Sequence, residues 1–288
     1  MDAQKKTVLV TGGAGFIGTH LCKRLLNDGY AVISLDNYFT GSHENHIEGV
    51  EYREGHTKDI EAMVPETPDL VYHLGEYSRV EISLSEPDMV WDLNIHGTYA
   101  VLEFWRKRKM KLVYAGSSTK FSDGGLGRDQ SPYAFSKATN TDLTQNYADW
   151  YDLPFAITYF YNVYGQGERA GKYGTLIEIL KQKYLRGGGF TVHAPGTQMR
   201  IFTHVDDIVE GLILVGEKGE GDEFGLGANE AYSILDIAKM FDAPIEMGPE
   251  VKGNRMTAKL DLTKSRALGW SAQHKIEDYI QEIKKAKK

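Results

Sequence analysis

Apolar residues in the first half of the chain form short uninterrupted runs that alternate with segments of helical periodicity. The runs cover residues 7–12, 31–36, 69–75, 111–117 and 155–161, and apolar residues spaced for one helix face cover 16–28, 90–107 and 133–150. Strands without polar alternation are buried on both faces, as in parallel sheets covered by helices. The pattern therefore predicts an α/β fold built on a doubly wound parallel sheet.

The pattern changes after Gly165. Glycine-rich stretches at 165–174 and 187–189 separate shorter helices and strands. We therefore predict a first domain over residues 1–165 and a smaller C-terminal lobe over 166–288. Residues 202–228 are expected to pack back on the first domain, because Asp206 and Asp207 are typical of the start of an apolar helix.

Composition and charge limit the classes of function that the protein can have. The 288 residues are enough for one large or two smaller lobes, and the formal net charge of −7 argues against nucleic acid as a partner. A phosphate-bearing ligand would then be held by a few placed cations and backbone amides. The single cysteine, Cys22, excludes an internal disulfide. No apolar run reaches the roughly 18 residues that span a membrane, so we expect a cytoplasmic protein.

The first predicted strand leads into a glycine-rich turn with glycines at positions 12, 15 and 18. Such glycines let the backbone approach a pyrophosphate at the start of a helix. Asp36 ends the second strand, where a carboxylate accepts hydrogen bonds from the adenosine ribose and repels a 2′-phosphate. A glycine turn without a ligand is the alternative. We predict an NAD site made of Gly12, Gly15, Phe16, Ile17, Gly18, Asp36, Asn37 and Leu74.

Tyr133 and Lys137 are four residues apart, so they lie on one face of the predicted helix 133–150. Ser131 can cap this helix, and a positive helix end, Lys137 and an oxidised nicotinamide would all favour the phenolate that a tyrosine base requires. Taken alone, such a pair is usually a core tyrosine with a solvated lysine. Ser117, at the end of the preceding strand, favours catalysis, because it can hydrogen-bond a substrate hydroxyl beside Tyr133.

Together the glycine turn, Asp36, Asn94, Ser117 and the Tyr133/Lys137 pair resemble the extended short-chain dehydrogenase/reductase family, in its nucleotide-sugar epimerase/dehydratase branch. Residues 72–75, 94–98, 161–165 and 196–207 match further stretches in the family's order. The resemblance implies a Rossmann-type NAD domain followed by a substrate-binding lobe. It also implies that Tyr133 takes a proton from a sugar hydroxyl, usually O4, while hydride passes to NAD and Lys137 holds the nicotinamide ribose.

The same resemblance implies further roles. Asn94 would support the region of Lys137 in the cofactor site, and Asn162 would bind the nucleotide-diphosphate sugar. Arg200 and Arg255 would pair with its diphosphate. The full set of expected substrate-binding residues is Arg79, Ser118, Thr119, Asn162, Arg200 and Arg255. Helices 90–107 and 133–150 would form the four-helix interface of a homodimer. No metal site is expected, because His43 and His46 lack a third ligand and helix capping explains residues 204–207.

Departures from the family bear on the reaction. Dehydratases of this branch resemble one another in a Thr-Asp-Glu where this chain has Ser117, Ser118 and Thr119, and the related decarboxylases keep the Glu. The missing carboxyl group favours a 4-epimerase that acts through a transient 4-keto sugar. A net 4-dehydrogenase or ketoreductase, a 4,6-dehydratase and a non-catalytic NAD-binding sensor stay open. The sequence also departs from the family at residues 120–122, 55–57 and 159, and the 117–133 loop is short.

Overall fold

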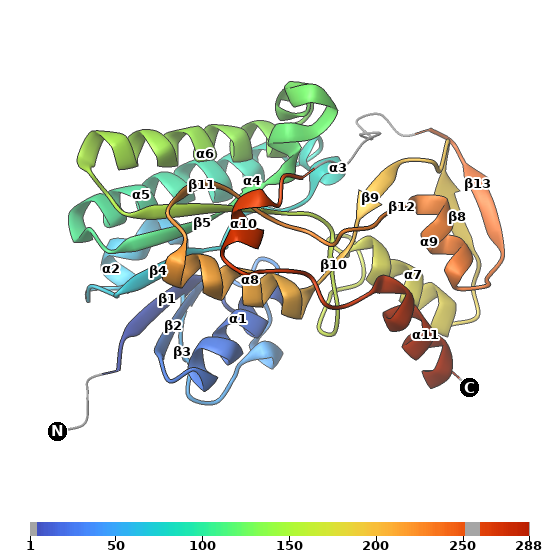
Figure 1. Ribbon diagram of the computed structural model, residues 1–288, viewed down its shortest axis with the longest axis horizontal. Coiled ribbons are helices and arrows are strands. Elements are labelled where there is room, and N and C mark those ends of the chain that lie inside the picture. Colours follow the sequence, from blue (N-terminus) through green and yellow to red (C-terminus); the bar gives the residue numbers. More distant parts are fainter. Residues whose placement is uncertain (1–4, 251–259, 288) are drawn as a thin grey trace.

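A sheet of seven parallel strands forms the centre of the protein in the computed structural model, which describes residues 5–250 and 260–287 (Figure 1). Its strand order is β11-β6-β5-β4-β1-β2-β3. The predicted α/β fold with a doubly wound parallel sheet is confirmed. The seven strands are β1 (Thr7–Thr11), β2 (Ala31–Asp36), β3 (Glu51–Glu54), β4 (Leu70–His73), β5 (Lys111–Ser117), β6 (Phe155–Phe160) and β11 (Gly221–Leu226).

Helices cover both faces of this sheet (Figure 1). Successive side chains of a strand point to opposite faces, so Val8 and Val10 belong to one hydrophobic cluster and Leu9 to another. The first cluster lies under α1 (Phe16–Asn27) and α8 (Val205–Lys218). The second lies under the helices α2 (Ile60–Met63), α5 (Gly97–Arg108) and α6 (Pro132–Tyr151).

The segment predicted as one helix over 90–107 is divided into three parts. It comprises the end of α4 (Pro87–Val90), a π-helical turn over Trp91–His96, and α5. A π turn adds one residue to the helical repeat and so turns the following side chains to a new direction. Here Asn94 lies inside that turn and is fully buried.

The smaller lobe has its own core, in which Phe190, Phe241 and Ile280 are buried. Its strands form two short sheets of two strands each, one parallel and one antiparallel. Its elements are α7 (Leu176–Leu185), β8 (Phe190–His193), β9 (Met199–Ile201), β12 (Ala231–Ser233), α9 (Ile234–Met240), β13 (Ile245–Gly248) and α11 (Ile276–Ala286).

The chain returns to the large sheet between the two halves of this lobe. A parallel pair of β7 (Val163–Tyr164) and β10 (Thr203–His204) marks the crossing, after which α8 and β11 pack on the sheet. The boundary at 165/166 stays a prediction. The remaining short elements are α3 (Val80–Ser83), α10 (Thr263–Ala267) and 3-10 turns at His43–Asn45, Thr57–Asp59 and Ser118–Asp129.

Candidate active site

A cavity of about 590 Å³ opens at the carboxyl ends of β1, β4 and β5 and is lined by residues of both lobes. This is the edge of a parallel sheet where ligands bind in α/β proteins. Asn94 is buried outside the cavity lining, and Arg255 lies outside the described residues. The other predicted site residues all line it: Gly12, Gly15, Phe16, Ile17, Gly18, Asp36, Asn37, Leu74, Arg79, Ser117, Ser118, Thr119, Tyr133, Lys137, Asn162 and Arg200.

The glycine turn packs too closely for side chains. Gly12 has a φ of 75°, and a Cβ there would lie 2.9 Å from the backbone of Gly75. A Cβ on Gly18 would clash with the carbonyl oxygen of Gly12. Gly15 is the N-cap of α1 and offers no side-chain cap, and the first turn carries no acidic residue. The first amides of α1 are therefore available to a phosphate group.

Asp36 lies at the end of β2 in the same cavity. Its Oδ2 accepts a hydrogen bond from the amide of Ala14 at 2.9 Å, and its Oδ1 accepts one from the amide of Tyr38 at 2.8 Å. Burial raises the pKa of Asp36, and these amides oppose that effect. Each carboxylate oxygen keeps room for a second donor. The glycine turn and Asp36 together fit a dinucleotide that has free ribose hydroxyls.

Tyr133 and Ser117 meet in the cavity. Ser131 caps α6 by accepting a hydrogen bond from the amide of Ala134 at 3.1 Å, which places Tyr133 in the first turn. The Tyr133 hydroxyl donates to Ser117 Oγ at 3.2 Å. Ser117 Oγ also accepts from the amide of Thr119 at 3.3 Å, so its position is fixed from both sides.

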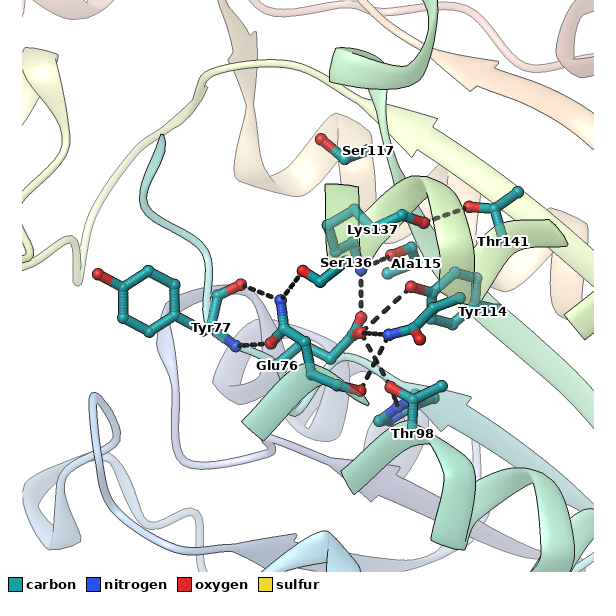
Figure 2. A network of polar contacts seen from close by, with 12 residues as sticks. Glu76, Tyr77, Thr98, Tyr114, Ala115, Ser117, Ser136, Lys137 and Thr141 are labelled. Carbon is teal, nitrogen blue, oxygen red and sulfur yellow. Dashed lines mark hydrogen bonds and ion pairs between the residues drawn. The ribbon is translucent and has the colours of Figure 1, made fainter. Parts of the chain in front are cut away.

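Lys137 is held by a carboxylate that the motif analysis did not single out (Figure 2). Its Nζ forms an ion pair with Glu76 and donates to the carbonyl oxygen of Ala115 at 2.5 Å. The ammonium also lies 4.5 Å from the centre of the Tyr114 ring. The Lys137 and Glu76 side chains are only 6% and 3% exposed, so this is a buried ion pair.

Glu76 accepts hydrogen bonds from four side chains on three elements, α5, α6 and β5 (Figure 2). Besides Lys137 on α6, it accepts from Asn140 Nδ2 at 2.9 Å, from the Thr98 hydroxyl at 2.9 Å and from the Tyr114 hydroxyl at 3.2 Å. Burial alone would raise the pKa of Glu76, but the Lys137 ammonium and the hydrogen bond from Asn140 lower it. Glu76 is therefore ionised.

His73 extends the network to the glycine turn. Burial lowers the pKa of His73 to about 4, so the ring is neutral. The hydroxyl proton of Thr98 goes to the Glu76 carboxylate, so the 2.9 Å contact between His73 Nε2 and Thr98 requires a proton on Nε2. Nδ1 then accepts from the Thr11 hydroxyl at 2.7 Å, and Thr11 Oγ1 accepts from the amide of Gly75.

Asn94 braces the same region from the π turn. Its Oδ1 accepts from the amide of Tyr77 at 2.6 Å, and its Nδ2 donates to Ser136 Oγ at 2.9 Å. Its carbonyl oxygen accepts from Asn140 Nδ2. Asn94 thus contacts the segment after Glu76 and the helix that carries Lys137, without lining the cavity.

Three of the predicted substrate residues that line the cavity are Arg79, Asn162 and Arg200. Arg79 Nε donates to the carbonyl oxygen of Tyr173 at 2.8 Å, and burial lowers the pKa of Arg79. Asn162 Nδ2 donates to the carbonyl oxygen of Ile201 at 3.1 Å, and Arg200 is only 8% exposed. Loop 165–174 adds Arg169, Lys172 and Tyr173, which the motif analysis did not single out.

Two of the sequence departures contact one another. The ring of Phe121 packs edge-on against Tyr159, with centroids 4.8 Å apart, and Lys120 pairs with Asp142 at 3.1 Å. Both contacts fix the segment after Ser118 against the sheet and α6. These substitutions therefore have a packing role.

A histidine cluster lies outside the cavity lining at the start of α8. Ligand atoms of His204, Asp206 and His274 lie within 4.8 Å of one another. His204 Nδ1 accepts from the amide of Asp206, as predicted for a helix cap, and His274 Nδ1 bonds to Asp207 at 2.9 Å. These hydrogen bonds account for the positions of both rings.

No helix among the described residues combines the length and apolarity needed to cross a membrane.

Comparison with known proteins identifies the class. The chain belongs to the NAD dependent epimerase/dehydratase family, whose model matches residues 8–227, and its cofactor is NAD. A putative UDP-glucose 4-epimerase of Methanocaldococcus jannaschii is 28% identical, with 96% of each chain covered. A UDP-N-acetyl-alpha-D-glucosaminuronate decarboxylase of Bacillus cytotoxicus is 29% identical over 82% of this chain and 79% of its own.

Solved structures agree with this assignment. The UDP-glucose 4-epimerase of Thermotoga maritima, solved with UDP-glucose, has a TM-score of 0.90 and 26% identity, and 98% of this chain and 100% of that chain are covered. The UDP-glucose 4-epimerase of Thermus thermophilus, solved in complex with NAD, has a TM-score of 0.86 and 27% identity, with 96% of each chain covered. The resemblance seen in the sequence motifs is confirmed.

Proposed function

We propose that the protein is an NAD-dependent nucleotide-sugar 4-epimerase that acts through a transient 4-keto sugar. One observation carries the proposal: the Tyr133 hydroxyl contacts Ser117 at 3.2 Å inside the cavity that the glycine turn and Asp36 also line. A sugar hydroxyl placed beside this pair lies next to both a base and a hydrogen-bond partner.

Each residue has a defined part in the reaction. Tyr133, as the phenolate, takes the proton from the sugar O4, and Ser117 orients that hydroxyl. The chemistry that bound NAD supplies is reversible acceptance of the hydride from C4. Tyr133 then returns its proton to the oxygen of the 4-keto sugar after the sugar has presented its other face. Arg79, Asn162 and Arg200 hold the nucleotide diphosphate at the wall of the cavity.

The carboxyl groups of the cavity favour epimerisation over elimination of water. Among the described residues that line the cavity, the carboxylates are Asp36, Glu76 and Glu81. Asp36 accepts bonds from backbone amides, Glu76 is paired with Lys137, and Glu81 is exposed in the first turn of α3. Ser118 and Thr119, beside Tyr133, carry no acid for dehydration. The epimerase names of the archaeal relative and of the two solved structures support the same choice.

Product analysis tests the proposal. The protein, supplied with NAD, is incubated with UDP-, GDP-, CDP- and dTDP-sugars, and the products are identified by NMR. We expect one 4-epimer and no net accumulation of NADH. Accumulating NADH would instead identify the dehydrogenase. A product that has lost water would identify a dehydratase, and one that has lost carbon dioxide would identify a decarboxylase.

Replacement of the proposed base tests the mechanism. Tyr133→Phe should lower kcat by about 10²- to 10⁴-fold, because general base catalysis is lost, while NAD still binds. Tyr30→Phe, at a half-buried tyrosine before β2, is the matched control and should retain activity. Undiminished turnover by Tyr133→Phe would rule out the assigned base.

We also propose a homodimer formed through α5 and α6. Large side chains on these helices and the adjoining π turn are exposed to solvent: Trp91 by 41%, Tyr99 by 53%, Phe135 by 42%, Trp150 by 61% and Tyr151 by 43%. Exposed aromatic residues gathered on one helical layer are typical of a protein–protein interface.

A further inference from the structure

We propose that Glu76 is a positioning residue that holds Lys137 as a buried ion pair and sets the pH at which Tyr133 loses its proton. The inference rests on the proposed function, because it assigns the base to Tyr133. It differs from the usual expectation that a lysine near the tyrosine contributes an uncompensated positive charge. Here the lysine charge has a partner within the same cavity wall.

The acceptor positions of the Glu76 carboxylate are fully used. An ionised carboxylate offers about four acceptor positions, and Glu76 receives donors from Lys137, Asn140, Thr98 and Tyr114. Replacing a buried ion pair by apolar side chains of similar size is often neutral or stabilising. A contribution to folding stability therefore does not explain why this ion pair is present. Its position next to the reaction centre indicates a role in the reaction.

The pairing with Glu76 also determines the direction of the Lys137 ammonium. It donates to Glu76 and to the carbonyl oxygen of Ala115, which leaves one of its three N–H groups for any ligand in the cavity. Glu76 therefore fixes where this remaining donor can point. An ammonium paired with a carboxylate also has a much weaker field at a neighbouring phenol than a free ammonium, because the opposite charges largely cancel.

The charged and titratable groups around the pair come from β4, β5, α6 and the start of α3. His73 on β4 is neutral, since burial lowers its pKa to about 4, and burial raises the pKa of Tyr114 on β5 well above its ordinary value. Tyr133 lies one helical turn before Lys137 on α6, and Arg79, at the start of α3, lines the same cavity as Tyr133. Glu76 is thus the negative charge in direct contact with Lys137, and its removal should favour the Tyr133 phenolate.

The decisive experiment is a titration of Tyr133. Tyrosinate absorbance is recorded against pH for the full-length protein with and without NAD, and the same titration of Tyr133→Phe is subtracted. Glu76→Gln should lower the pKa of Tyr133 by about one unit or more, because Lys137 becomes uncompensated. Glu76→Asp keeps the charge and should stay near the wild-type value. Glu103→Gln, which removes a carboxylate bonded to Arg106 and Tyr147 outside the cavity, is the control.

A merely structural Glu76 gives a different result. Glu76→Gln would then reduce thermal stability and leave the pKa of Tyr133 unchanged, and that outcome would overturn the proposal. If Glu76→Gln does not fold, Glu76→Gln combined with Lys137→Met buries no unpaired charge. The proposal expects this double variant to keep the wild-type pKa of Tyr133, whereas a clear rise would show that Lys137 acts without compensation.

Turnover adds an independent check. The acidic limb of the kcat/KM profile for the active nucleotide sugar should move to lower pH in Glu76→Gln by the same amount as the titration. If wild-type protein converts none of the sugars, the proposed function fails. The absorbance titration requires no substrate, so it still decides the role of Glu76 in that case.

Discussion

Asp36 shows how one side chain can select between two dinucleotides. The amides of Ala14 and Tyr38 hold its carboxylate at the end of β2, in the wall of the cavity. A fixed carboxylate accepts bonds from ribose hydroxyls and repels a phosphate at the 2′ position. We therefore expect the preference for NAD to depend on the Asp36 carboxylate, whose orientation is fixed by backbone amides.

Asp36→Ser should reduce this preference. We expect the Kd for NAD to rise about 10-fold, because a hydrogen bond to a charged acceptor is worth about 1.5–3 kcal/mol, while the Kd for NADP falls or stays level. Calorimetric titration with both dinucleotides measures the ratio. Asp28→Asn, at the exposed C-cap of α1, should leave it unchanged. A variant that still rejects NADP as strongly as the wild type would contradict this account of Asp36.

Sequence motifs anticipated the meeting of Tyr133 with Ser117 but not the partner of Lys137. Tyr133 and Ser117 follow from local rules, namely a helix start and a strand end. Glu76 acquires its role from contacts with α5, β5 and α6, which no local pattern specifies. The sequence does hold a signal for Glu76, because an acidic residue directly after an apolar strand lies at the carboxyl edge of the sheet, where sites form.

At the scale of elements, the start of α6 determines where Tyr133 lies. Ser131 Oγ accepts from the amide of Ala134, and Pro132 begins the helix. Pro132 has no N–H to satisfy, and its fixed φ suits the first helical turn. The cap therefore connects helix stability to the geometry of the proposed base.

Ser131→Ala should lower the free energy of unfolding by about 1 kcal/mol, as expected for loss of an N-cap. Urea denaturation followed by circular dichroism measures the change. The control is Ser85→Ala, because Ser85 is exposed and donates to the carbonyl oxygen of Ile82 without capping a long helix. Equal stabilities of the two variants would show that the cap contributes little.

Helical periodicity predicted α1 and α6 well and α5 only partly. A pattern of apolar residues averages over several turns, so it cannot show the π turn at Trp91–His96. That turn depends on hydrogen bonds between Asn94, Tyr77 and Ser136, which join separate segments. Similarly, β11 has polar residues at Asp222 and Glu223 because it is an edge strand, and no apolar run marks it.

At the scale of the whole molecule, the exposed aromatic residues of α5 and α6 predict association. Light scattering at micromolar concentration should give the mass of a dimer. Tyr99→Glu should shift the protein to the monomer, because a charge in a desolvated apolar interface is costly. Leu185→Glu, on the exposed side of α7, is the control. A monomeric mass for the wild type would exclude the proposed dimer.

The order of the strands has a consequence for synthesis on the ribosome. The sheet acquires α8 and its edge strand β11 only after α7, β8 and β9, the first half of the smaller lobe, have been made (Figure 1). Until then the nascent chain exposes the unpaired edge of β6 and an apolar face of the sheet, both of which promote aggregation. A fragment that ends at residue 165 would remain in this incomplete state. We therefore expect the nucleotide-binding half to aggregate when it is expressed alone.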